Sequence, residues 1–251
     1  MTRAPEPTPW EAQAKALIRR RYAQLAAADS FHDDARDKAR AAGVPEAWYD
    51  ALPARIASVF SGCGWPAGAL RDWDHRMVVD LGCGGGLDTR FVAERLPTDS
   101  DVIALDLTPE LLARVHDTVA DIDGANVRTL AADMERLPLA NGIADVVIAN
   151  ASLNLATDKT AAFAEVARIL RHGGHLLAAD LIRSGPLPPE IMADPMAMAS
   201  SLGGVVEETE FRAALDGAGF TEIEFSGHRP FGPVIAVDIS ARNQPAENNP
   251  S

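Results

Sequence analysis

Four short, nearly continuous apolar runs dominate the middle of the chain, and each carries an Asp or Asn at or near its end. They read RMVVDLG at 76–82, DVIALDL at 101–107, IADVVIAN at 143–150 and GGHLLAADLI at 173–182. The stretches between these runs, at 87–96, 109–120 and 158–171, have the pattern of helices. Apolar strands that alternate with helices indicate βαβ units, in which a parallel sheet is covered on both faces. We therefore expect an α/β fold.

The N-terminal part of the chain has a different character. Helices are predicted at 10–28, at 33–42 with an end at Gly43, and from Pro45 toward Leu52. The apolar positions there are too few for a separate core. We therefore expect residues 1–70 to form a helical lid that packs onto a larger domain at 71–241.

The C-terminal part completes the predicted sheet. A strand is predicted at NVRTLAA (126–132), and two more at 221–227 and 234–240 are joined by GHRPFGP, which is short enough for an antiparallel hairpin. The sheet should therefore have seven strands. A Pro- and Met-rich stretch at 182–206 is interpreted as a flexible cover over an active site, membrane insertion being the weaker reading. A helix is expected at 207–217, and the tail at 242–251 is expected to be disordered.

Charge and composition exclude several classes of function. The formal net charge of −13 argues against a nucleic-acid partner, which would require clustered Lys and Arg. No segment is long and apolar enough to cross a membrane, and the N-terminus does not have the pattern of a signal peptide. Two cysteines among 251 residues fit a reducing compartment, so we expect a cytoplasmic protein. The sequence leaves monomer and dimer open.

The most informative motif is VVDLGCGGGLD, where a predicted strand ends at Leu81 and a helix follows a glycine-rich turn. Glycines at such a turn let the backbone approach a ligand where a Cβ atom would collide. The dinucleotide-binding spacing is G-x-G-x-x-G, whereas Asp80, Gly82, Gly84 and Gly86 form D-x-G-x-G-x-G. That arrangement resembles the first motif of class I S-adenosylmethionine-dependent methyltransferases.

This resemblance implies a Rossmann-like methyltransferase fold, a small-molecule substrate and S-adenosyl-L-methionine as the cofactor. It implies that Asp80 and Asn150 lie beside the methionine part, that Asp106 accepts the ribose hydroxyls, and that Asp133 and Met134 hold the adenine. The residues expected to bind the cofactor are Tyr22, Asp80, Gly82, Cys83, Gly84, Gly86, Asp88, Asp106, Leu107, Thr108, Asp133, Met134 and Asn150.

A narrower resemblance covers residues from about 21 to about 230. VIALDLTPELL, NASLNLATDK and ALPARIASVFSGCGWP are similar to segments of arsenite methyltransferases. Those enzymes hold trivalent arsenic through several thiolates, which suit a soft ion. Of those positions only Cys63 is a cysteine here; Ala151 occupies one, and Ser201 (or Ser200) another. Trp65 replaces the usual Asn. We therefore expect this chain to keep the fold and cofactor of these enzymes but not their substrate.

Candidate catalytic and substrate-binding residues follow from this comparison. Asn154 and Cys63 are the candidates for catalysis, and Cys63 could equally be a small buried residue in a turn. The residues expected to contact the substrate are Cys63, Trp65, Asn154, Ser200, Ser201 and Glu208. Asp158 is interpreted as a helix N-cap. His172 and His175 are expected in a turn at the opposite edge, so no metal site is predicted.

The favoured function is therefore methyl transfer from S-adenosylmethionine to a small molecule, with a soft acceptor such as a thiol or selenol. An O- or N-methyltransferase of secondary metabolism and an arsenite methyltransferase are alternatives. Transfer of another group from the same cofactor, or a non-catalytic sensor that binds it, also fits the sequence.

Overall fold

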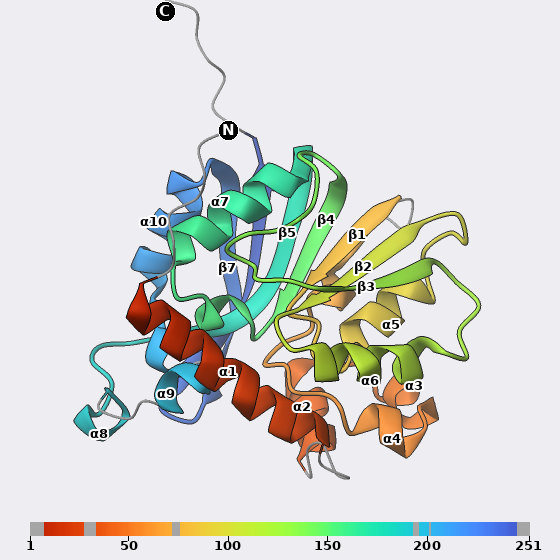
Figure 1. Cartoon of the computed structure of the whole chain (residues 1–251), viewed down its shortest axis with the longest axis horizontal. Coiled ribbons are helices and arrows are strands. Elements are labelled where there is room, and N and C mark those ends of the chain that lie inside the picture. The colour runs from red at the N-terminus through yellow and green to blue at the C-terminus, as the bar shows by residue number, and fades with distance from the viewer. Residues whose placement is uncertain (1–7, 28–33, 72–75, 193–195, 201, 245–251) are drawn as a thin grey trace, which may run out of the picture.

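A computed structural model describes residues 8–27, 34–71, 76–192, 196–200 and 202–244 of the chain. Its centre is one twisted sheet with the order β3-β2-β1-β4-β5-β8-β7 (Figure 1). The strands are β1 (Met77–Leu81), β2 (Asp101–Asp106), β3 (Asn126–Ala131), β4 (Ala144–Asn150), β5 (Leu170–Arg183), β7 (Phe220–Phe231) and β8 (Val234–Asn243). The first five strands in this order are parallel, and β8 and β7 are antiparallel. The predicted α/β class and the C-terminal hairpin are confirmed, whereas the sheet has eight strands and not the predicted seven, because a short strand also pairs with β5.

Helices pack on both faces of the sheet. The helices of the described residues are α1 (Pro9–Ala27), α2 (Ala35–Ala42), α3 (Glu46–Ala51), α4 (Ala54–Ala57), α5 (Leu87–Ala93), α6 (Pro109–Val119), α7 (Lys159–Ile169), α8 (Pro189–Met192), α9 (Met196–Ala199) and α10 (Glu208–Gly217). Short 3-10 turns follow at η1 (Pro66–Ala69), η2 (Leu153–Leu155) and η3 (Leu202–Gly204). Within the described residues no helix is both long and apolar enough to span a bilayer.

Three apolar clusters hold these layers together. Phe163 of α7 and Phe211 of α10 pack at 5.2 Å between ring centres against one face of the sheet, and Phe91 of α5 packs on the other. The N-terminal helices pack around Tyr49 and Phe60 in a third cluster that includes Leu87 of α5. The N-terminal region therefore shares its core with the domain that follows it.

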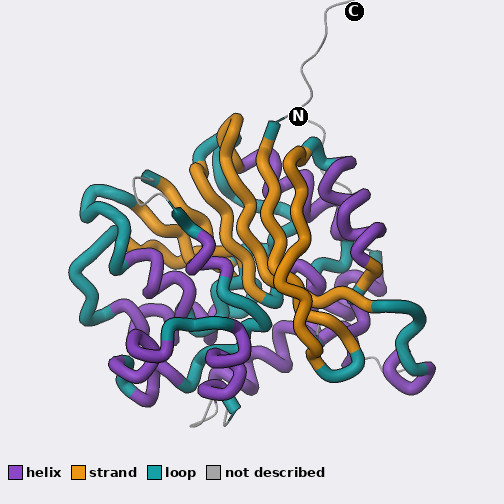
Figure 2. Tube along the Cα trace, turned by 180° about the vertical axis from the view of Figure 1, so that it is seen from behind, coloured by secondary structure: helices purple, strands orange, loops and turns teal. Residues whose placement is uncertain are grey.

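The view from behind shows the middle strands of the sheet uncovered between helices (Figure 2). Along β8 the side chains of Asp238, Ser240 and Arg242 are only partly buried, whereas Val237, Ile239 and their alternate neighbours are buried. One wet face is normal for antiparallel strands.

The structure corrects several predicted boundaries at the C-terminal end of the chain. The hairpin turn is only 232–233, because 228–231 continue β7. β8 extends through Asn243, whose side-chain amide donates to Leu170 O at 2.9 Å. The two-residue strand β6 (Val206–Glu207), which pairs with β5, was not predicted. The rest of the expected tail lies outside the described residues.

The prediction that His172 and His175 lie in a turn is wrong. β5 begins at Leu170, which pairs with Ala144 of β4, and the next pair is His175 with Val146. β5 therefore advances five residues over the length in which β4 advances two. This wide bulge takes up the extra residues, with Gly173 in the left-handed region at φ 74°. The histidines therefore belong to a bulged strand.

Candidate active site

The glycine-rich turn after β1 is held by the end of β2. The backbone N–H groups of Gly82 and Cys83 both donate to Leu105 O, at 2.7 and 2.9 Å. Gly82 has φ +75°, and a Cβ there would lie 2.4 Å from the Cβ of Ser152. Only glycine satisfies both conditions without a shift of the neighbouring chain.

Asp106, at the end of β2, faces the same turn. Its Oδ2 accepts from Gly84 N at 3.1 Å, and its Oδ1 accepts from Thr108 N at 2.8 Å. Burial raises the pKa of this carboxyl, and the N–H groups of Thr108 and Gly84 oppose that rise. The two hydrogen bonds fix the orientation of the carboxylate toward the adjoining space.

Asp80 and Asp88 form a buried pair of carboxyl groups below the turn. Thr89 Oγ1 donates to Asp80 Oδ2 at 2.5 Å, and Asn150 Nδ2 donates to Asp88 Oδ2 at 3.0 Å. Burial, together with the charge of Asp88, raises the pKa of Asp80 to about 8, and burial raises that of Asp88 to about 6. Asp88 Oδ1 is buried with no hydrogen-bond partner. The pair is therefore prepared for a cationic partner.

Asn150, at the end of β4, links this pair to the first Gly-Cys-Gly segment of the chain. Its Oδ1 accepts from Cys63 N at 3.0 Å, and its Nδ2 donates to Gly64 O at 2.9 Å. A Cβ on Gly62 would lie 2.3 Å from Asn150 Nδ2. Glycine at position 62 thus allows the segment to lie directly on this side chain.

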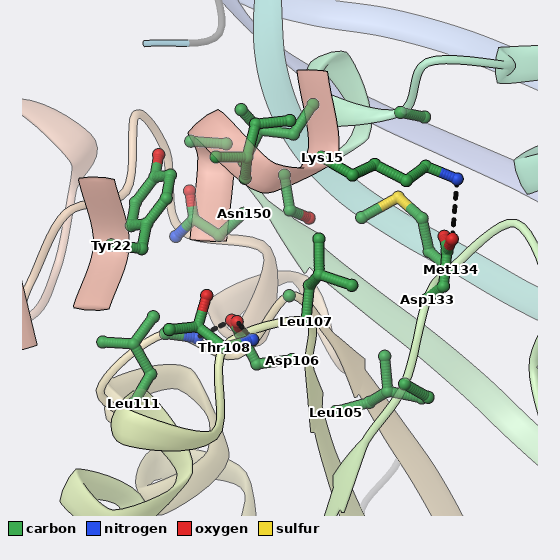
Figure 3. Close-up of a pocket in the computed structure, with 18 of the residues that line it drawn as sticks. Lys15, Tyr22, Leu105, Asp106, Leu107, Thr108, Leu111, Asp133, Met134 and Asn150 are labelled. Atoms are coloured by element: carbon green, nitrogen blue, oxygen red, sulfur yellow. Dashed lines mark hydrogen bonds and ion pairs between the residues drawn. The ribbon is translucent and has the colours of Figure 1, made fainter. Parts of the chain in front are cut away.

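A cavity opens beside these groups (Figure 3). Of the residues predicted to bind the cofactor, it is lined by Tyr22, Gly82, Gly84, Asp106, Leu107, Thr108, Asp133, Met134 and Asn150. A smaller cavity shares Gly82, Gly84 and Asn150 with it and adds Asp80, Cys83 and Asp88. Gly86 lines neither; it starts α5 with φ +85° beside Val115.

Sequence reasoning missed more than half of the wall of the larger cavity. The missed residues are Lys15, Ile18, Ser61, Leu105, Leu111, Ala132, Glu135, Ala151, Ser152, Leu155 and Ala156. One face of α1 carries Lys15, Ile18 and Tyr22, which are three and four positions apart. Because Tyr22 is a predicted cofactor residue, this helical spacing indicates that Lys15 and Ile18 also face the cavity. Ala151 follows Asn150 with a left-handed backbone at φ 56°, a conformation that an alanine does not predict.

The expectation that Asn154 contacts a substrate is wrong for this structure. The side chain is completely buried, and its Nδ2 donates to Asp180 Oδ1 and to Leu181 O, both at 2.7 Å. It lines neither cavity. Its place in η2 buries it against β5, so it holds the polypeptide chain beside the cavity.

Trp65 is also not a lid over an acceptor. Its ring packs against Phe91 at 4.8 Å and against Trp48 at 5.6 Å between ring centres. These partners come from α3 and α5, and Trp65 does not line the larger cavity. An aromatic cluster explains its position.

Cys63 is buried among apolar side chains that include Ala179, Leu181 and Val234. Burial, together with the nearby Asp180, raises the pKa of its thiol well above the usual value. Ala151 is the one residue of the larger cavity's wall that also packs on this cluster. The thiol therefore lies behind the wall and does not form part of it.

The remaining predicted substrate residues lie elsewhere. Ser200 Oγ donates to Ala197 O at 3.0 Å within α9, and Glu208 pairs with His228 at 2.9 Å on the surface. Neither lines the larger cavity, and Ser201 lies outside the described residues. The predicted N-cap is confirmed: Asp158 Oδ1 accepts from Ala161 N at 2.9 Å.

Comparison with known proteins agrees with this geometry. Residues 78–174 match the family model described as a methyltransferase domain. This part of the chain is therefore similar to methyltransferase domains. The chain is 32% identical to the arsenite methyltransferase of Halobacterium salinarum over 76% of this chain and 50% of that protein. The enzyme of the same name from Aquipseudomonas alcaligenes is also 32% identical, over 66% of this chain and 50% of its own length. The chain thus spans about half the length of the curated relatives it matches.

A solved structure shows the same fold. The arsenic(III) S-adenosylmethionine methyltransferase of Chlamydomonas reinhardtii superposes with a TM-score of 0.59 at 22% identity, over 80% of this chain and 73% of that one. The chain therefore shares the fold of that S-adenosylmethionine methyltransferase.

The residues around the two cavities fit that cofactor. The glycine turn at 82–86 leaves space for a ligand, and the unpartnered Asp88 Oδ1 suits an ammonium group. The fixed carboxylate of Asp106 suits vicinal hydroxyls, while Leu107 and Met134 offer apolar contacts to a flat ring. The donors and shapes therefore match the parts of S-adenosylmethionine in order.

Proposed function

We propose that the protein transfers a methyl group from S-adenosylmethionine to a small molecule whose acceptor atom is soft, such as a thiol or selenol. The observation that carries the proposal is the larger cavity, on which the glycine turn, Asp106, Asp133, Met134 and Asn150 converge. The cofactor supplies, when bound, a methyl group on a positively charged sulfur.

The chain's own contribution to such a transfer is binding, orientation and exclusion of water. Asp106 would hold the ribose, Asp133 and Met134 the adenine, and Asp80 with Asp88 the amino group. Ile18 and Tyr22 of α1 close the other side of the cavity. Correct placement of two reactants contributes much of the rate in reactions of this kind, because it replaces an encounter in solution.

The preference for a soft acceptor rests on the groups that line the larger cavity. Its carboxylates are already engaged: Asp106 accepts two backbone N–H groups, and Asp133 and Glu135 both bind Lys15. Among the described residues of its wall there is no histidine or cysteine that could act as a base. An acceptor that is nucleophilic without help fits this wall better than an alcohol or amine.

Arsenite is the second candidate, because two curated relatives at 32% identity are arsenite methyltransferases. The two cysteines weigh against it, since both are buried and free, and burial raises the pKa of each thiol. Thiolate ligands for arsenic would have to form from these groups or come from outside the chain.

Residues 1–70 are proposed as the lid and 182–206 as the cover of the acceptor side. The buried, unpaired cysteines suit the cytoplasm, which we keep as the proposed compartment.

Isothermal titration with S-adenosylmethionine and S-adenosylhomocysteine tests the cofactor. We expect micromolar binding by the wild type and a loss of at least about tenfold in the Asp106→Ala variant. Binding that is absent, or unaffected by this substitution, would contradict the assignment of the cavity.

Turnover with a panel of thiols, selenols, phenols, amines and arsenite tests the acceptor. Mass analysis of the product separates transfer of a methyl group from transfer of a larger part of the cofactor. Methylation of phenols or amines alone would overturn the preference for a soft atom, and binding without any turnover would favour a sensor.

A further inference from the structure

Lys15 is the one cation among the described residues around the larger cavity, and its side chain reaches from α1 to the opposite wall (Figure 3). Its Nζ lies 2.6 Å from Asp133 Oδ2 and also contacts Glu135 Oε2. The side chains of Lys15 and Glu135 are 17% and 8% exposed, so water screens this contact less than it screens a surface ion pair. Burial alone would lower the pKa of Lys15, but the hydrogen bonds to Asp133 and Glu135 outweigh it and raise that pKa.

Both carboxylates have a second role that connects Lys15 to the rest of the site. Asp133 Oδ1 accepts from Glu135 N at 3.0 Å. Glu135 Oε1 accepts from Thr157 N at 2.7 Å and from Thr157 Oγ1 at 2.8 Å, just before α7. Because a carboxylate offers about four acceptor positions, Asp133 can still receive an amine from a bound adenine. Lys15 and a cofactor can thus share this carboxylate.

The other end of α1 is fixed by a second cation. Arg114 of α6 donates from Nε and Nη2 to Ala26 O, at 3.0 and 2.7 Å. This pair of bonds satisfies a carbonyl that the last turn of a helix leaves open. Between these two attachments, Ile18 and Tyr22 face the cavity. The contact of Lys15 is therefore the attachment of α1 that passes directly over the cavity.

We propose that Lys15 is a positioning residue for the cofactor, whose ion pairs with Asp133 and Glu135 hold α1 closed over the cavity and set the rate of cofactor release. The proposal rests on the proposed function, since it takes the adenine to bind beside Asp133. A ligand beneath Ile18 and Tyr22 leaves only when α1 moves, and α1 moves only when Lys15 separates from both carboxylates.

Hydrogen exchange on the ligand-free protein tests the closure without reference to any cofactor. In Lys15→Met, which keeps an unbranched side chain one atom shorter and removes its charge, amides of 9–27 should exchange about tenfold faster. Lys15→Arg should stay near the wild type. Lys38→Met, which removes the exposed pair with Asp34 on α2, is the matched control.

Dissociation of S-adenosylhomocysteine, followed by stopped flow, tests the link to the ligand. We expect release about tenfold faster from Lys15→Met, and near the wild-type rate from Lys15→Arg. Unchanged hydrogen exchange in Lys15→Met overturns the proposal. So does faster exchange that is equally large at 144–150, and so does faster exchange without faster release of the ligand. If the wild type fails to bind the ligand, the proposed function fails, while the exchange result still decides whether Lys15 closes α1. Glu135→Gln repeats both measurements from the other side of the ion pair should Lys15→Met not fold.

Discussion

Asp80 lies at the end of β1 with its carboxyl group completely buried, and burial together with the neighbouring Asp88 raises its pKa to about 8. The folded protein therefore binds this proton more tightly than the unfolded chain, in which the pKa is near 3.8. The stabilisation from Asp80 is complete below pH 4 and is lost as the pH rises toward 8. A group arranged for a cationic ligand thus destabilises the ligand-free protein at neutral pH.

Asp80→Asn should consequently stabilise the ligand-free protein and weaken the binding of the cofactor. We expect a gain of about 2 kcal/mol in the free energy of unfolding at pH 8, which vanishes near pH 4. Thermal unfolding at pH 5, 6.5 and 8 checks the trend, and Asp117→Asn on the exposed side of α6 is the control. A gain that does not depend on pH would show that charge is not its cause.

At the scale of single residues, sequence reasoning found the side chains that a motif places at strand ends. Asp106 and Asn150 follow directly from that pattern. It failed for Asn154, because nothing in the sequence shows that β5 brings Asp180 against it. It also missed the pairing of Lys15 with Asp133, because a salt bridge across 118 positions leaves no local pattern.

Elements far apart in the chain meet at the segment 62–64, which lies across the ends of β4 and β5. A Cβ on Gly64 would lie 2.4 Å from the Cβ of Ala179, and one on Gly62 would meet the amide of Asn150. The segment has no regular secondary structure, so its position depends on these close approaches and on the hydrogen bonds of Asn150.

Gly62→Ala should therefore destabilise the protein by about 2 kcal/mol or more, because the added methyl group displaces a hydrogen-bonded side chain. Gly217→Ala, at the end of α10 with open space around it, should be neutral or stabilise by about 0.5 kcal/mol. Urea unfolding of both variants checks the contrast. Equal effects would show that the contact with Asn150 is not what requires glycine at 62.

Asn150→Asp offers a second test of the same junction. The new carboxylate would lie beside Asp88 Oδ2 and would leave Gly64 O without its donor. We expect a loss of about 3 kcal/mol at pH 8, partly restored at pH 5, because Asp88 with a pKa of about 6 then carries a proton that the pair can share. Urea unfolding at the two pH values measures the difference, and a loss that is equal at both would contradict repulsion as its cause.

At the scale of elements, periodicity located the strands and helices of the parallel part and erred where strands deviate from regularity. The bulge at the start of β5 and the extension of β7 to Phe231 both depend on a partner strand. A glycine pair and a Pro read locally as a turn, but pairing with β4 and β8 overrides that local preference.

The molecule as a whole keeps both of its thiols out of solvent. Cys63 and Cys83 are 5% and 9% exposed, and each lies in an apolar cluster that joins separate parts of the fold. A reagent can reach them only when those parts separate, so their reactivity reports on openings of the structure.

Both thiols should therefore react with Ellman's reagent at pH 8 about 100-fold more slowly than a free thiol, and rapidly in urea. S-adenosylhomocysteine should slow Cys83 further, because that residue lines the smaller cavity. Absorbance with mass mapping of the labelled cysteine checks both rates. Rapid labelling of Cys63 in the native protein would contradict its burial and strengthen the case for arsenite.

The overall architecture was predictable because it depends on the order of apolar runs, which a single sequence displays. The packing of the N-terminal helices was less predictable. Their core includes Leu87 of α5 and Leu111 of α6, which are far from these helices in the sequence. A lid that has no core of its own takes its position from its neighbours.

The single amide of Asn150 holds the turn that follows β1, through Asp88, and the segment that carries Cys63. During evolution such a residue is not expected to change alone. A protein in which it is replaced should also carry substitutions at position 88 or at the glycines 62 and 64. Related sequences should therefore gain or lose these residues as a set, and their pattern of joint substitution would record when the two regions became dependent on one another.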